Sequence, residues 1–274
     1  MFDYPFLESI QSILPLCDEF VIVVGKSDDD TLSKIRSLNH PGIKIIETTW
    51  DESLRSGGAI LAQQTNIALS HTRGDWAFYL QGDEVVHEQD LPIIQRAMEQ
   101  YRDDRRVEGL LFDFIHFYGS YAYVGNSRRW YRREIRIVRT GIGVSSWQDA
   151  QGFRIGARKM NVVPIGASIY HYGWVKPPRI QLQKQKHFNR LWHPDAWIAD
   201  HVQQGEQYDY STGGILTKFR GTHPAGMRER IQSQDWTFSY DPANVKHTTR
   251  ESVLMWIEEK TGRRLGEYKN YLLL

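Results

Sequence analysis

A run of five apolar residues at 20–24, Phe-Val-Ile-Val-Val, is the feature that most constrains the fold of this chain. Its length and its β-branched content predict a strand buried on both faces. Similar short strands are expected at 43–47 and 76–80, and they alternate with predicted helices at 31–38 and 59–70. Such alternation favours right-handed crossovers, and therefore an α/β fold with a mostly parallel central sheet and flanking helices.

The pattern changes after a predicted helix at 90–104. Apolar stretches joined by glycine-containing turns predict further strands, at 107–117, 134–139, 153–157 and 167–172. These strands indicate a mixed or antiparallel extension of the sheet. Two consecutive prolines end this pattern, and the segments that follow them are mainly helical. We therefore expect two parts, residues 1–175 with the sheet and residues 176–274 as a mainly helical carboxyl-terminal extension.

Charge and cysteine content exclude several classes of protein. The 274 residues carry 34 Lys and Arg against 33 Asp and Glu, a net charge of +1, so no overall electrostatic attraction to nucleic acid is expected. The single cysteine, Cys17, excludes an intrachain disulfide and a zinc site built from thiolates, and it favours a reducing, cytoplasmic location. No apolar run approaches the ~18 residues that a membrane-spanning helix needs.

Acidic turns follow two of the predicted strands. One turn contains Ser27 and Asp29, and the other contains Gln81, Asp83 and Glu84. Ligands of open parallel sheets bind beyond the carboxyl ends of the strands, and adjacent carboxylates there suit Mg²⁺ or Mn²⁺. In the alternative interpretation, these acids only cap the segments that follow.

Three segments in order carry a resemblance to a known family: VVGKSDDDT, SGGAILAQQTNIALS and RGDWAFYLQGDE. Together they resemble the family 2 glycosyltransferases, which have the GT-A fold, and the likeness covers roughly residues 3–175. The resemblance implies a GT-A domain over 1–175 that moves a sugar from a nucleotide diphosphate to a glycan or lipid-linked acceptor. It also implies a divalent metal, Mn or Mg, an inverting reaction, and a role in polysaccharide biosynthesis.

The resemblance also assigns roles to residues of the donor site. Asp83 matches the second aspartate of the family's Asp-x-Asp motif, which holds the metal, whereas Gln81 stands where the first aspartate would be and brings no charge. Ser27 and Asp29 match a turn near the nucleoside, and Asn66 matches a common helix asparagine. These five residues form the predicted nucleotide-sugar site.

Two later residues complete the predicted machinery. Asp149 resembles the base that deprotonates the acceptor hydroxyl in inverting members. A loop-capping role for Asp149, with Asp113 or Glu84 as the base, remains the alternative. His171 resembles a histidine that completes the metal or diphosphate site, and a hydrogen-bonded structural histidine is the alternative.

The arginines at 128–139 allow three interpretations. They form a solvated strand face, a binding site for phosphate, or a nucleic-acid surface. The phosphate belongs either to the donor or to a lipid-linked acceptor, which implies peripheral contact with the inner membrane face. A nucleic-acid-binding protein that uses this run is one alternative function, and a non-catalytic GT-A-like protein that binds a sugar nucleotide or glycan is another.

The family normally opens with a strand that this sequence lacks before its first helix. We expect a mis-assigned start or a fragment, because a sheet without that strand would expose an edge or an apolar groove. The alternative is a protein that truly lacks the strand.

Overall fold

The computed structural model describes residues 2–51, 53–54, 56–245 and 248–274. Its helices are α1 (Phe6–Ile13), α2 (Thr31–Ser37), α3 (Ala59–Ser70), α4 (Leu91–Gln100), α5 (Pro178–Asn189), α6 (Asp195–His201), α7 (Arg228–Gln232) and α8 (Thr249–Thr261). Its strands are β1 (Phe20–Gly25), β2 (Ile43–Thr48), β3 (Trp76–Phe78), β4 (Glu84–Val86), β5 (Gly109–Tyr118), β6 (Ser120–Gly125), β7 (Arg133–Arg139), β8 (Val144–Trp147), β9 (Gly152–Ile155), β10 (Asn161–Trp174), β11 (Leu216–Lys218) and β12 (Leu272–Leu273). Short 3-10 turns connect several of them.

The helices and strands confirm an α/β fold, but the large sheet is mixed. Among the described residues, parallel pairing is confined to β1 with β2, β5 with β10, and β10 with β12. β3, β4, β6, β7 and β11 all pair in the antiparallel sense. The mostly parallel central sheet that we expected is therefore not what the strands form, because β3 pairs with β7 instead of extending the β1–β2 pair.

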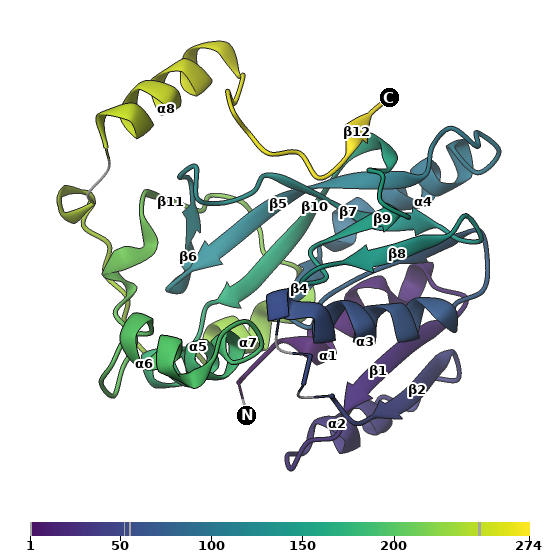
Figure 1. Cartoon of the computed structure of the whole chain (residues 1–274), viewed down its shortest axis with the longest axis horizontal. Helices are drawn as coiled ribbons and strands as arrows, with labels where there is room; N and C mark the ends of the chain where they lie inside the picture. The colour runs from purple at the N-terminus through teal and green to yellow at the C-terminus, as the bar shows by residue number, and fades with distance from the viewer. Residues whose placement is uncertain (1, 52, 55, 246–247) are drawn as a thin grey trace.

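β1 and β2 form a separate small sheet. Figure 1 shows them with α2 at one end of the molecule, with α5 and α6 at the opposite end and α8 standing apart from the sheets. An apolar cluster around Ile10, Val24 and Ile35 holds α1 and α2 against this small sheet.

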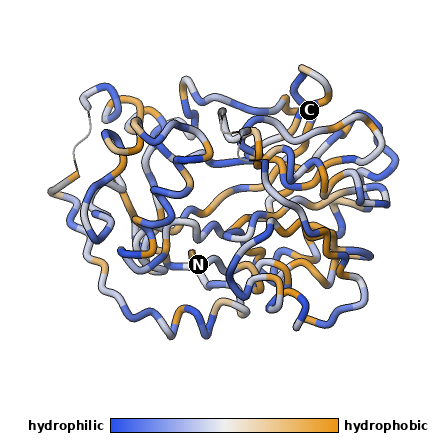
Figure 2. Tube along the Cα trace, turned by 60° about the horizontal axis from the view of Figure 1, so that its bottom comes forward, coloured by the Kyte–Doolittle hydropathy of each residue, from blue (hydrophilic) through white to orange (hydrophobic). Residues whose placement is uncertain are grey.

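The main core lies between the large sheet and the helices α1 and α4. The helices contribute Ile13, Ile94 and Ala97 to this core. The strands β5 and β10 contribute Leu110, Phe112 and Ile169. Hydrophobic stretches of the trace accordingly follow the central strands, as the orange segments in Figure 2 show. The apolar spacing of α1 predicts this contact, because residues three and four positions apart share one helix face.

The carboxyl-terminal part returns to the sheet. β11 pairs with β6, and β12 pairs with β10 near the end of the chain. The division into 1–175 and 176–274 stays a prediction, but residues beyond 176 add two strands to the sheet as well as the helices α5 to α8. No described helix has the length and apolar character required to cross a bilayer.

Candidate active site

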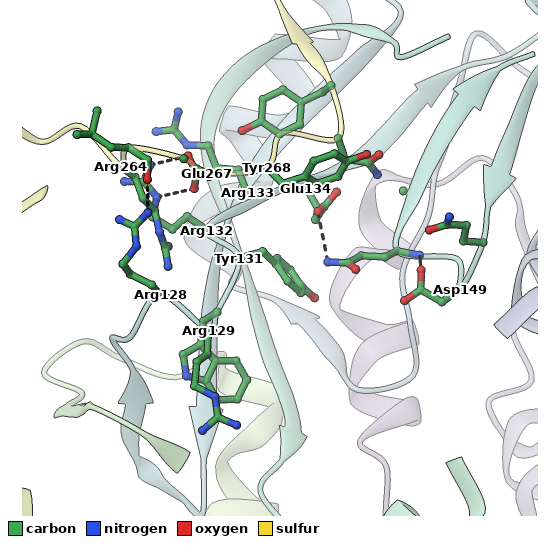
Figure 3. Close-up of a pocket in the computed structure, with 18 of the residues that line it drawn as sticks. Arg128, Arg129, Tyr131, Arg132, Arg133, Glu134, Asp149, Arg264, Glu267 and Tyr268 are labelled. Atoms are coloured by element: carbon green, nitrogen blue, oxygen red, sulfur yellow. Dashed lines mark hydrogen bonds and ion pairs between the residues drawn. The ribbon is translucent and has the colours of Figure 1, made fainter. Parts of the chain in front are cut away.

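A cavity of about 750 Å³ lies between three segments that are far apart in the sequence. The first is the arginine-rich stretch 128–134, which leads into β7; the second is the turn 147–152 between β8 and β9. The third runs from Arg250 and Leu254 of α8 to Tyr271 beside β12. Figure 3 shows arginine side chains along one side of this cavity and the carboxylates of Glu134 and Asp149 on the other.

Asp149 projects from the tight turn between β8 and β9. Its neighbours Gln148 and Ala150 both have positive φ angles, +53° and +62°, a conformation that non-glycine residues rarely adopt outside constrained sites. Burial raises the pKa of the Asp149 carboxyl, although the carboxylate accepts a hydrogen bond from the Gln151 amide at 3.3 Å. A carboxylate with a raised pKa is a stronger base near neutral pH.

The amino-terminal end of α3 sets the position of this turn. Gly58 precedes the helix with a φ of +71°, and a Cβ atom there would lie 2.9 Å from the Cβ of Asp149. The same Cβ would lie 3.0 Å from the ring of Trp192. Only glycine permits so close an approach between the helix end and the Asp149 turn.

Glu134 is a second acid in the cavity wall, and the sequence interpretation did not include it. Burial raises its pKa to about 7; Arg136 opposes the shift and Asp149 adds to it. Gln151 connects the two acids, because its side chain donates to Glu134 at 3.4 Å and its backbone amide donates to Asp149. The signal that could have identified Glu134 is its alternation with Arg136 and Val138 on one face of a strand, which predicts a carboxylate close to a guanidinium on that face.

The arginines of the run divide into a cavity group and a buried group. In the cavity group, Arg132 makes two hydrogen bonds to Glu267, at 2.9 and 2.8 Å, and Arg128 donates to Glu258 at 3.0 Å. Arg133 pairs at 2.6 Å with Asp113, one of the alternative bases. Arg128, Arg132 and Arg133 are therefore already paired with carboxylates near the cavity.

The buried arginines have structural partners. Arg136 makes two hydrogen bonds to Glu84, at 2.8 and 2.7 Å, and both side chains are fully buried. Arg139 donates to backbone carbonyls of the segment between α4 and β5. In the sequence interpretation, Glu84 is a possible metal ligand or alternative base. In the structure, both of its carboxylate oxygens are hydrogen-bonded to Arg136.

Asp83 lies outside the wall of this cavity. Its Oδ2 atom is 3.5 Å from Nζ of Lys184 and 3.7 Å from Nε2 of His171, so the structure brings together the two predicted metal ligands. Burial acts to raise the pKa of Asp83, but His171, Lys184 and Lys176 outweigh burial and lower it. Lys184 also donates to the Gly173 carbonyl at 2.7 Å.

Two histidines connect Asp83 to the cavity wall. Nδ1 of His171 is 3.1 Å from Nδ1 of His116, whose Nε2 is 2.8 Å from the carbonyl oxygen of Tyr131. Tyr131 lines the cavity. Asp83 is therefore separated from the cavity by His171, His116 and Tyr131.

The donors around Asp83 do not fit a divalent cation in this arrangement. In the described part of the chain, no three His, Cys, Asp or Glu side chains lie together as a metal site would require. Glu84 is engaged by Arg136, and the Gln81 amide donates to the Tyr79 hydroxyl at 3.0 Å. A cation on Asp83 would also lie beside the ammonium group of Lys184, which would repel it.

The remaining predicted donor residues lie outside the large cavity. Asp29 accepts hydrogen bonds from the Ser27 hydroxyl at 2.9 Å and from the Thr31 amide at 3.1 Å, and bonds to Thr31 are the main cause of its lowered pKa. Asn66 accepts a hydrogen bond from the Ser146 amide at 2.7 Å, beside a smaller cavity of about 310 Å³. Of the predicted site residues, Asp149 is the one that lines the large cavity.

Comparison with known proteins bears on the amino-terminal part of the chain. Residues 5–160, more than half of the chain, match the family described as Glycosyl transferase family 2. A search of curated proteins finds no match. The match begins at α1 and extends through β9, so it includes Asp83, Glu134 and Asp149. This chain therefore belongs to glycosyl transferase family 2.

Proposed function

We propose that this transferase moves a sugar from a nucleoside diphosphate to the hydroxyl group of a glycan or lipid-linked acceptor, with inversion at the anomeric carbon. The supporting observation is that Asp149, which is partly buried, lines an arginine-rich cavity together with a buried acid, Glu134. Family membership supports glycosyl transfer itself.

In the proposed reaction, the acceptor oxygen forms a bond to the anomeric carbon as the bond from that carbon to the diphosphate breaks. The diphosphate leaves with the electron pair of that bond, and the Asp149 carboxylate takes the proton of the acceptor hydroxyl. A single displacement of this kind inverts the anomeric configuration. Burial favours this role because it raises the pKa of Asp149 and so makes its carboxylate more basic.

Positive charge around the cavity would bind phosphate groups of the substrates. Arginine guanidinium groups match phosphate oxygens in pairs and stabilise charge that develops on a leaving phosphate. We propose that Ser27, Asp29, Asn66, Gln81 and Asp83 contribute to donor binding, as the family resemblance implies. Dependence on Mn²⁺ or Mg²⁺, with Asp83 and His171 as ligands, stays a prediction of that resemblance, and a cytoplasmic location stays a prediction from the single cysteine.

Asp149→Asn tests the proposed base. Transfer, or slow donor hydrolysis, should fall by about 10²- to 10⁴-fold because the amide cannot accept the proton. Thermal stabilisation by nucleoside diphosphates should stay unchanged, since the substitution preserves shape. Asp103→Asn, which removes an equally simple carboxylate at an exposed site, should retain full activity.

The same transfer and hydrolysis assay distinguishes the other candidate functions. Running it with Mn²⁺, with Mg²⁺ or with a chelator tests metal dependence directly. A non-catalytic binding protein is the second candidate, favoured by the amide at Gln81 and the unsuitable donors around Asp83. Nucleoside diphosphate binding without any transfer or hydrolysis would support that candidate and contradict the enzyme.

A further inference from the structure

The helix α8 lines the large cavity without belonging to the apolar core. It contains the apolar run 253–257, yet none of its residues is buried. Figure 1 shows it standing apart from the sheets. Two of its residues, Arg250 and Leu254, nevertheless line the cavity. α8 therefore covers part of the cavity without a buried side chain to hold it there.

One carboxylate of α8, that of Glu258, lies among three guanidinium groups. Its Oε2 atom is 3.0 Å from Arg128 and 3.6 Å from Arg264, and its Oε1 atom is 3.4 Å from Arg132. Figure 3 shows these three arginines on the same side of the cavity. Guanidinium groups bind carboxylate and phosphate oxygens with the same geometry. Glu258 therefore occupies a position that suits a phosphate group.

The three arginines also have partners outside α8. Arg128 donates to the carbonyl oxygen of Leu265, and Arg264 donates to that of Ser127 at 3.2 Å. The third arginine makes the two hydrogen bonds to Glu267 described above. These bonds would keep the guanidinium groups in place without α8. Departure of the helix would thus leave a preformed cluster of cations at the cavity.

The contacts of Glu258 are weak compared with those that a diphosphate can make. Its side chain is 23% exposed, and ion pairs that solvent reaches contribute little, since water and salt screen them. The carboxylate also brings a single negative charge. A diphosphate brings more than one charge and presents several oxygens to the guanidinium groups, so its exchange for Glu258 is favourable.

The ends of α8 are defined by local signals. A capping box formed by Thr248 and Glu251 begins the helix, and Gly262, with a φ of +67°, ends it. A Cβ atom at Gly262 would meet no atom within 4 Å, so the chain is not tightly packed where it leaves the helix. Isolated helices as short as the 13 residues of α8 are marginally stable in water. A released α8 should therefore unfold in part.

We infer that α8 is a displaceable cover of the cavity. Glu258 occupies a phosphate position among Arg128, Arg132 and Arg264, and a diphosphate that binds these arginines releases the helix. The inference rests on the proposed function for one point, which is that the diphosphate belongs to the sugar donor. The helix would then regulate that site, because it covers the cavity until a donor is present.

Limited proteolysis of the full chain with trypsin tests the release of α8. Trypsin cleaves after Arg250 and Lys260, which both lie in this helix. Inorganic pyrophosphate, added at constant ionic strength, should accelerate cleavage at these two sites about fivefold, because a released helix exposes its backbone. Mass spectrometry of the fragments identifies the sites. A ligand that merely tightened the fold would slow cleavage there.

Glu258→Gln tests the contact that holds the helix. The variant should be cleaved in α8 about fivefold faster than the wild type without any ligand, because the neutral amide pairs more weakly with the arginines. Its dissociation constant for pyrophosphate, measured by isothermal titration, should fall by about the same factor, since fewer molecules are in the covered state. Glu259→Gln removes the same charge from the next, exposed position and should behave like the wild type.

Three results would overturn the inference. The first is cleavage of α8 in the wild type that pyrophosphate slows or leaves unchanged. The second is an equal effect of Glu258→Gln and Glu259→Gln, which would assign the change to net charge. The third is failure of both the wild type and Glu258→Gln to bind pyrophosphate. The wild-type measurements decide the matter even if Glu258→Gln folds poorly.

The failure of the proposed function is distinguishable from the failure of this inference. Pyrophosphate binding and cleavage of α8 are measured without a sugar donor or an acceptor. A protein that releases α8 with pyrophosphate but neither transfers nor hydrolyses a donor would contradict the transferase and retain the cover. A protein that transfers sugar while pyrophosphate leaves α8 protected would contradict the cover alone.

Discussion

The carboxyl group of Glu134 is buried in the cavity wall between the guanidinium group of Arg136 and the acid Asp149. Burial raises its pKa to about 7 from an ordinary value of 4.5. The folded protein therefore holds this proton more tightly than the unfolded chain does. The free energy of unfolding should therefore fall as the pH rises from 4.5 to about 7. Above that range, the contribution of Glu134 should no longer change with pH.

Glu134→Gln tests that pH dependence because glutamine stays neutral at every pH. Relative to the wild type, the variant should gain up to about 3 kcal/mol in unfolding free energy as the pH rises from ~4.5 to ~8. Urea unfolding of both proteins across this range measures the difference. A difference between wild type and variant that stays constant with pH would show that Glu134 has an ordinary pKa.

Glu84 shows how the sequence and the structure can assign different partners to one residue. Its place next to Asp83 suggested a shared cation, because adjacent carboxylates at the end of a strand are a common metal site. In the structure both of its oxygens bond to Arg136, 52 positions away. A carboxylate that is buried needs such a partner, because a buried charge left unpaired is strongly destabilising, and the pairing depends on the packing of β7 beside β3.

At the scale of single elements, the junction between Gly58 and α3 determines where Asp149 lies. Gly58→Ala should destabilise the protein by about 2 kcal/mol, since it combines a strained positive φ with a contact that is too close. It should also reduce transfer, because the Asp149 turn must move away from the new methyl group.

Gly57→Ala is the matched control for this substitution. Gly57 also has a positive φ, +62°, but a Cβ atom there would meet no atom within 4 Å. Gly57→Ala should therefore lower the free energy of unfolding by about 1 kcal/mol and leave the rate of transfer unchanged. Chemical denaturation and transfer rates measured on the two variants separate backbone strain from displacement of Asp149. Equal losses of transfer in both would contradict the role given to Gly58.

At the scale of the whole molecule, the end of the chain closes the cavity by returning to the sheet. Tyr271 is buried against Leu111, Ile135 and Phe153, next to the pairing of β12 with β10. Tyr271→Ala should lower the unfolding free energy by about 3 kcal/mol through the cavity that it creates. Leu274, three residues further along the chain, is exposed, and Leu274→Ala should change stability by less than about 0.5 kcal/mol.

Loss of the Tyr271 anchor should also weaken binding in the cavity. Glu267, Tyr268 and Asn270 line the cavity just before Tyr271, so their positions depend on it. Isothermal titration with nucleoside diphosphates or with inorganic pyrophosphate, carried out below the lowered melting temperature, reports this effect. Unaltered ligand binding in Tyr271→Ala would show that the segment holds its place without this contact.

The sequence by itself determined the local elements and the family. The helices α2 and α3 and the strands β1, β2 and β7 lie where the apolar pattern predicts them, because helix and strand periods depend on backbone geometry over a few neighbouring residues. The ordered motifs of the first 160 residues likewise indicated the glycosyltransferase family that the comparison supports. Asp149 was selected as a candidate on the same basis.

Only the tertiary structure decided how these elements combine. It paired β3 with β7, joined Glu84 to Arg136, placed Glu134 beside Asp149, and surrounded Asp83 with Lys184 and His171. None of these contacts follows from local spacing, since each joins segments separated by many residues and arises only when specific faces pack together. Their energies also depend on burial, which weakens solvent screening and makes the choice of charged partner decisive.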